Sequence, residues 1–137
     1  MRVKCEINNG RYLSGKYFAA FRAESERTLY HVSIGKEYWV FAMAVFQSVL
    51  ILLLIDDTNK PNWYGIELFS VTDSQVPTNW LFSTSIANDH GVEAIWGYER
   101  LISDPEHYGA LIERDPSALE VFAEEKLRVA DADAGRN

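Results

Sequence analysis

Two groups of side chains in this sequence are of types that transfer protons or bind metal ions. Asp56 and Asp57 directly follow an apolar run, and Asp89 and His90 stand about one turn before Glu93. Paired carboxylates, or a carboxylate beside a histidine, serve general acid–base catalysis. Successive side chains on a strand point to opposite faces, so Asp56 and Asp57 converge only if the strand has ended before them. Alternatively, Asp56 and Asp57 are a charged strand end that discourages aggregation. Asp89 and His90 are alternatively ordinary polar residues of a loop.

The other reactive side chains match no catalytic or metal-binding motif. The histidines, His31, His90 and His107, form no His-x-x-x-His pair, and the chain has no Cys-x-x-Cys, no Gly-x-Ser-x-Gly and no glycine-rich phosphate loop. Cys5 is the single cysteine, which excludes an internal disulfide, and its alternating segment is typical of a thiol on a strand face. We therefore expect no catalytic residue, no metal and no cofactor.

Large aromatic side chains indicate a binding surface instead. The chain has four tryptophans and seven tyrosines. Trp63 and Tyr64 directly follow the polar loop 58–62, where an exposed pair would anchor a partner protein. Packing in the core or at the mouth of a barrel is the alternative.

The apolar stretch from Tyr38 to Ile55 decides what kind of protein positions these side chains. It reaches the lower length limit of a membrane-spanning helix. Gln47 and Ser48 lie at its midpoint, however, and its aromatic and β-branched residues favour strands. Two strands over 37–46 and 49–55, joined at Gln47 and Ser48, bury the same residues without a membrane, although Gln-Ser is a weak hairpin turn. Both faces of the first strand are apolar, so the hairpin needs cover on two sides.

Strand signals dominate residues 1–90. We expect an edge strand over 1–8, an irregular connection over 16–26, an alternating segment over 30–34, and strands over 67–71 and 80–86 around the central hairpin. About five or six short strands separated by turns predict a small antiparallel barrel. The fold class is therefore α+β, with the barrel followed by two or three C-terminal helices in one domain, 1–137.

Helix signals dominate residues 91–130. A helix over 92–101 is expected first, and Asp104-Pro105 and Asp115-Pro116 each provide a carboxylate cap followed by proline, which predicts two further helix starts. The expected apolar stripe of the last helix consists of Leu119, Phe122, Ala123, Lys126 and Leu127, with Glu120, Glu124 and Glu125 largely off it. Residues 131–137 are expected to fray.

The net charge of −7 is concentrated at one end of the chain. Residues 1–90 hold nine acidic and eight basic side chains, whereas residues 91–137 hold eleven and five. This acidity argues against direct binding of DNA or RNA, whose phosphates are also negative. It suits a basic protein partner, or solubility alone. The absence of a hydrophobic leader segment at the start and the lone cysteine predict a cytoplasmic protein that neither enters a membrane nor is secreted.

One set of residues resembles a known family. The pattern consists of Gly35-Lys36-Glu37-Tyr38-x-Val40, Asp56-Asp57, Pro61-x-Trp63-Tyr64, Leu68-Phe69-x-Val71-x-Asp73 and Pro77-x-x-Trp80-x-Phe82. It resembles small bacterial immunity proteins of polymorphic or contact-dependent toxin systems, built on an SH3-like barrel with a helical C-terminal part. The resemblance covers roughly 34–82 and departs from the family at Gly65, where a proline is usual. It implies a non-catalytic cytoplasmic protein that neutralises a cognate toxin by binding it.

Two functional hypotheses follow, and a third stays open. In the first, this chain covers a basic toxin domain, for example a nuclease, with a partner-binding surface. The residues assigned to that surface are Asp56, Asp57, Trp63, Tyr64, Glu113, Glu120 and Glu124. In the second, the chain is a small enzyme or ligand-binding barrel that uses Asp89 and His90, or Asp56 and Asp57, in an aromatic pocket. A scaffold or dimerising protein would instead expose an apolar patch on the hairpin or the last helix.

Overall fold

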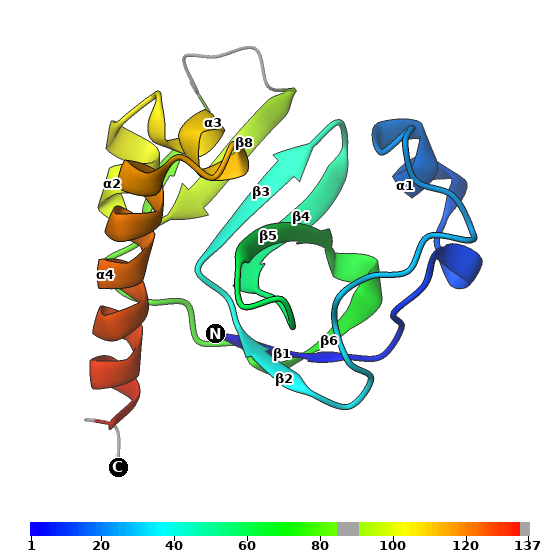
Figure 1. Ribbon diagram of the computed structural model, residues 1–137, viewed down its shortest axis with the longest axis horizontal. Coiled ribbons are helices and arrows are strands. Elements are labelled where there is room, and N and C mark those ends of the chain that lie inside the picture. The colour runs from blue at the N-terminus through cyan, green and yellow to red at the C-terminus, as the bar shows by residue number, and fades with distance from the viewer. Residues whose placement is uncertain (85–90, 135–137) are drawn as a thin grey trace.

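The described part of the chain folds into two antiparallel sheets and four α-helices. The computed structural model describes residues 1–84 and 91–134 of the chain. One sheet has three strands in the order β2-β1-β6, and the other has five in the order β5-β4-β3-β8-β7. In Figure 1 the helices α2, α3 and α4 lie on one side of the sheets and α1 lies on the other.

The elements have the following bounds. The strands are β1 (Arg2–Cys5), β2 (Glu37–Trp39), β3 (Ala42–Phe46), β4 (Val49–Ile55), β5 (Pro61–Gly65), β6 (Phe69–Asp73), β7 (Leu81–Ser83) and β8 (Val92–Gly97). The helices are α1 (Gly15–Ala20), α2 (Glu99–Ser103), α3 (His107–Ile112) and α4 (Pro116–Ala134), with 3-10 turns η1 (Gly10–Tyr12) and η2 (Ile66–Leu68). None of the helices in these described ranges has the length and apolar character required to cross a bilayer.

The central hairpin is confirmed. β3 pairs with β4 from Ala42 opposite Leu53 to Phe46 opposite Val49. Gln47 and Ser48 both have positive φ angles, 44° and 69°, as a type I′ hairpin turn requires. The turn therefore forms without the usual Asn-Gly pair, because the long apolar strands on either side fix the register.

The predicted strand over 37–46 is in fact two strands in different sheets. β2 pairs with β1, and β3 pairs with β4 and β8. The chain changes sheet at Val40 and Phe41, whose amides donate to the carbonyl oxygens of Met1 and Leu53. The predicted closed barrel is therefore wrong: the protein has two open sheets, joined by this crossing, with eight strands among the described residues.

Three further expectations for the N-terminal part are wrong in whole or in part. β1 is the middle strand of its sheet and not an edge. Residues 16–20 of the predicted irregular connection 16–26 belong to α1, which is capped by the Ser14 hydroxyl accepting from the amide of Tyr17, whereas residues 21–26 form no helix or strand, as predicted. The alternating segment 30–34 forms no strand. Cys5 lies buried in β1, as expected.

The C-terminal part contains one strand more than expected. Residues 92–97, predicted to start a helix, form β8, which pairs with β3 and β7. The helix start predicted at Asp115-Pro116 is confirmed, since α4 begins at Pro116 and Asp115 accepts from the amide of Ser117. The start predicted at Asp104-Pro105 is two residues too early: α3 begins at His107, and Asp104 accepts from the amide of Glu106 in the turn before the helix. Residues 131–134 continue α4 and do not fray, and residues 135–137 lie outside the described ranges.

The α4 helix buries a different face from the predicted stripe. Its buried residues are Ala118, Phe122 and Glu125, and Leu127 is 66% exposed. Phe122 packs against Phe41, with 5.0 Å between the ring centroids, so this face closes the core over the point where the chain changes sheet.

Candidate binding site

Asp56 is a buried carboxylate with every acceptor position in use. The side chain is only 3% exposed. Its Oδ1 accepts from the amide and hydroxyl of Thr58, and its Oδ2 accepts from Asn62 Nδ2 at 2.7 Å and the Tyr64 hydroxyl at 2.6 Å. Burial raises the pKa of Asp56, but the hydrogen bonds outweigh it and the net direction is downward. Asp56 therefore holds the turn between β4 and β5 as a permanent anion.

Asp57 is held by a separate set of donors. Its Oδ1 accepts from Lys36 Nζ at 2.8 Å and from the Tyr38 hydroxyl at 2.7 Å, and its Oδ2 accepts from the Ser33 hydroxyl at 2.6 Å. Burial opposes ionisation, yet these bonds lower the pKa of Asp57 to about 2. The two carboxylates thus serve different segments and do not act as a catalytic pair.

The aromatic pair Trp63–Tyr64 is divided between two roles. Tyr64 is 7% exposed and donates to Asp56, so it belongs to the core. Trp63 is half-buried and its ring packs 5.6 Å from the Tyr108 ring of α3, between centroids. Trp63 lines a cavity, and Tyr64 is not among the described residues that line it.

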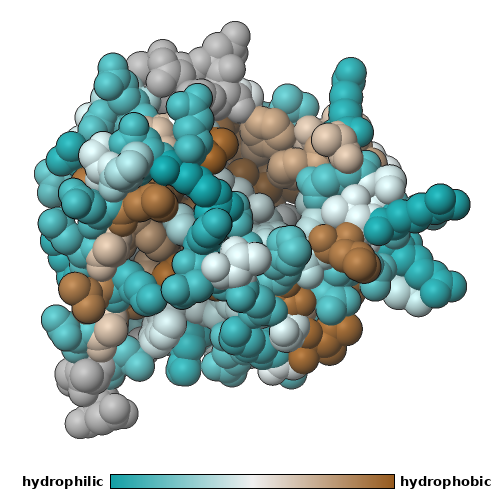
Figure 2. Space-filling model, in the orientation of Figure 1, coloured by the Kyte–Doolittle hydropathy of each residue, from teal (hydrophilic) through white to brown (hydrophobic). Residues whose placement is uncertain are grey.

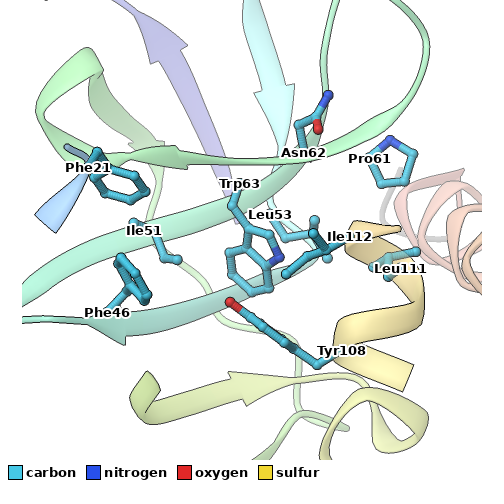
Figure 3. Close-up of a pocket in the computed structure, with 10 residues that line it drawn as sticks. All are labelled: Phe21, Phe46, Ile51, Leu53, Pro61, Asn62, Trp63, Tyr108, Leu111 and Ile112. Atoms are coloured by element: carbon cyan, nitrogen blue, oxygen red, sulfur yellow. The ribbon is translucent and has the colours of Figure 1, made fainter. Parts of the chain in front are cut away.

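That cavity is an apolar pocket between α1 and α3, over the strands β4 and β5. It has a volume of about 300 Å³. Phe21, Phe46, Ile51, Leu53, Pro61, Asn62, Trp63, Tyr108, Leu111 and Ile112 line it (Figure 3). In Figure 2 apolar side chains gather between the regions of α3 and α1, surrounded by hydrophilic ones. The volume lies at the small end of the range of about 300–1,000 Å³ for ligand sites.

Asn62 is the polar residue in the lining of this aromatic pocket, and its side chain is hydrogen-bonded to Arg114. Arg114 Nη2 donates to Asn62 Oδ1 at 2.9 Å. Among the described residues, neither Arg114 Nη1 nor Trp63 Nε1 has a hydrogen-bond acceptor, although both atoms are buried. Sequence reasoning missed Arg114 because its contact with Asn62 joins residues far apart in the chain.

A second group missed by sequence reasoning lies beneath α4. The Tyr98 hydroxyl and His107 Nε2 are 2.7 Å apart and buried. Burial lowers the pKa of His107, raises that of Tyr98, and raises that of the buried Glu125. Glu125 pairs with Arg128 at 3.1 Å. The His107 and Tyr98 rings are fully enclosed, so we interpret this pair as the contact that fixes α3 to the end of β8.

The three predicted acidic contact residues are all at the surface. Glu113 follows α3, and Glu120 and Glu124 lie one turn apart on α4. All three are exposed. Within the described part of the chain none of the three forms an ion pair, so their charges face solvent.

The remaining predictions concern Asp89, His90, His31 and the binding of a metal ion. Asp89 and His90 lie outside the described residues. Among the residues that are described, no three His, Cys, Asp or Glu side chains are grouped closely enough to hold a metal ion. His31 is exposed, as predicted.

No protein-family model matches the chain, and comparison with curated proteins and with solved structures finds no match. The resemblance to immunity proteins therefore rests on the residues quoted above. Function has to be inferred from the geometry of this chain.

Proposed function

We propose that this chain is a non-catalytic binding protein that neutralises a basic partner, a cognate bacterial toxin domain, by covering its surface. The observation that carries the proposal is the exposed acidic surface of Glu113, Glu120 and Glu124, whose carboxylates have no cation of their own among the described residues. Such a surface attracts a basic protein, speeds its association and selects against acidic proteins.

The aromatic pocket adjoins this surface, because Glu113 directly follows the pocket residue Ile112. Ile112 is 52% exposed. Apolar groups beside a rim of like charge are the arrangement by which protein interfaces combine affinity with specificity. The runner-up, an enzyme using Asp56 and Asp57, gains no support from the geometry because internal donors occupy both carboxylates.

The proposal is tested by producing the chain together with the product of the neighbouring gene. We expect a complex that co-purifies and restores growth when that product is toxic. Glu120→Lys/Glu124→Lys should slow association by roughly 10-fold at low ionic strength. This pair keeps the like-charge spacing on α4, so the helix itself is little affected.

The single variant Glu120→Lys is measured as well, with Glu26→Lys as its matched control, since both change the same charge at an exposed position without an ion pair in the described structure. It should leave association nearly unchanged. No complex, no growth rescue, or equal effects of Glu26→Lys and Glu120→Lys would contradict the proposal.

A further inference from the structure

A second cavity lies between the C-terminal half of α4 and the three-stranded sheet, and we call it the α4 groove. It has a volume of about 430 Å³, within the range of about 300–1,000 Å³ for ligand sites. Trp39 of β2 lines it, together with Val76 and Pro77 of the connection between β6 and β7. From α4, Val129 and Ala132 line it. In Figure 1 this half of α4 runs beside the start of β1. Much of the lining is therefore apolar.

Glu125 brings a buried carboxylate to the α4 groove. Its side chain is 7% exposed and belongs to the lining. Oε2 accepts from Arg128 at 3.1 Å, whereas Oε1 has no donor among the described residues. Oε1 is not one of the fully enclosed unpaired atoms, so a group in the adjoining space can reach it. An ionised carboxylate removed from water costs free energy unless cations or donors surround it.

Asp133 adds a second carboxylate to the same groove. It is half-buried, lines the groove and forms no ion pair with a described residue. It lies eight residues after Glu125 on α4, so at 1.5 Å per residue the two positions are about 12 Å apart along the helix. Val129 lies midway between them, on the same side of the helix. The α4 groove thus presents two carboxylates separated by an apolar stretch.

This arrangement is complementary to a linear molecule with a cation at each end. Ammonium groups carry three N–H donors each, and methylene chains pack against apolar surface. An anion would meet two carboxylates, a hydrocarbon would leave both unpaired, and a single metal ion could not span them. Arg128 does not satisfy the groove by itself, because its side chain is 63% exposed and ion pairs of exposed cations contribute little.

We propose that the α4 groove binds a linear diamine. One ammonium group pairs with Glu125, the other pairs with Asp133, and the methylene chain lies against Trp39 and Val129. The site is independent of the proposed toxin-binding surface, since Glu113, Glu120 and Glu124 do not line the groove. The net charge of −7 attracts cations in general, but only the groove selects a chain length.

The test uses octamethylenediamine as the probe, with octylamine and octanol as counterparts of equal chain length. Each is titrated into the full chain at about 0.15 M salt, which shortens the screening length to about 8 Å. The indole N–H signal of Trp39, assigned with Trp39→Phe, is followed by NMR. Trp39 lines the α4 groove and not the polar cavity on the other side of Glu125, so its signal reports the groove.

We expect the diamine to shift the Trp39 signal saturably. It should bind about 5-fold more tightly than octylamine and at least about 10-fold more tightly than octanol. No saturable shift would overturn the proposal. Octylamine binding as tightly as the diamine would overturn it too, because the groove would then take a single ammonium group, such as a lysine side chain of a partner protein.

Tetramethylenediamine separates the groove from general attraction. It carries the same charge as the probe, but its chain is too short to reach both carboxylates, so it should bind at least about 10-fold more weakly. Equal binding of the two diamines would overturn the proposal.

Three variants locate the two ammonium groups. Glu125→Gln and Asp133→Asn each remove one carboxylate with little change of shape, and each should abolish the preference for the diamine over octylamine. Asp131→Asn is the matched control, because Asp131 is exposed on the same helix and does not line the groove. It should preserve the preference. A preference that survives Glu125→Gln and Asp133→Asn, or that is lost equally in Asp131→Asn, would overturn the assignment.

Discussion

Asp57 accepts three side-chain hydrogen bonds that favour its ionised state. With a pKa lowered to about 2 against an ordinary value of 3.8, its contribution is present above the ordinary value and lost as the pH falls through about 2. Asp57→Asn should therefore lower the free energy of unfolding by about 1–3 kcal/mol near neutral pH. The difference from the wild type should shrink as the pH falls below about 4, as measured by urea denaturation. A difference that stays constant with pH would contradict this account.

The sequence indicated that Asp56 and Asp57 matter but not how. That the two side chains point apart at the end of the strand could be predicted from local geometry. Their donors could not, because Ser33, Lys36 and Tyr38 reach Asp57 only when the two sheets assemble. The link between Arg114 and Asn62 is equally non-local, and no periodicity marks it.

At the scale of elements, Gly65 determines how closely α1 approaches β5. A Cβ at this position would overlap Cε2 of the buried Tyr17 ring. Gly65→Ala should destabilise the protein by about 1–3 kcal/mol, since the enclosed Tyr17 cannot move aside. It should also displace Phe21, which stacks on Tyr17, and so alter the aromatic pocket.

Gly15→Ala is the matched control, because nothing lies within 4 Å of a Cβ there. It should be neutral or stabilising by about 0.4–1 kcal/mol. Thermal unfolding of the two variants separates these expectations. Equal melting temperatures of Gly65→Ala and Gly15→Ala would show that the Tyr17 ring can move aside.

Elements specified by local signals were predictable, and those specified by pairing partners were not. The β3–β4 hairpin and the cap at Asp115 follow from the adjacent sequence. β8 was missed because β3 and β7 pair with it on both sides and override its weak helical pattern. The Ser14 cap of α1 and the spacing of Ala118, Phe122 and Glu125 are local signals that a closer reading of caps and helical periodicity would have found.

At the scale of the whole molecule, the two open sheets replace the predicted barrel because one apolar segment serves both. β2 and β3 follow each other almost directly, yet they pair with strands of different sheets. The apolar character of both faces correctly indicated cover on two sides. It did not indicate that the chain changes partners at Val40 and Phe41, which depends on where Met1 and Leu53 present their carbonyl oxygens.

The uneven charge of the molecule has a consequence for its stability in salt. Glu99, Glu106, Glu113, Glu120 and Glu124 are all exposed on the helical side. Their mutual repulsion weakens as the screening length falls from about 30 Å at 0.01 M salt to about 8 Å at 0.15 M. Sodium chloride over this range should therefore raise the free energy of unfolding by a few tenths of a kcal/mol, following the usual size of like-charge effects on helices.

Glu120→Lys/Glu124→Lys should reduce this salt effect more than Glu26→Lys does, because only the former pair lies in the acidic cluster. Thermal unfolding at the two salt concentrations measures it. A melting temperature that falls with salt would mean that attraction in the ion pairs Lys36–Asp57 and Arg100–Asp104 outweighs the repulsion. In that case the acidic surface would lower the free energy of unfolding little. Its lack of internal cations would then no longer distinguish it as a surface that binds a basic partner.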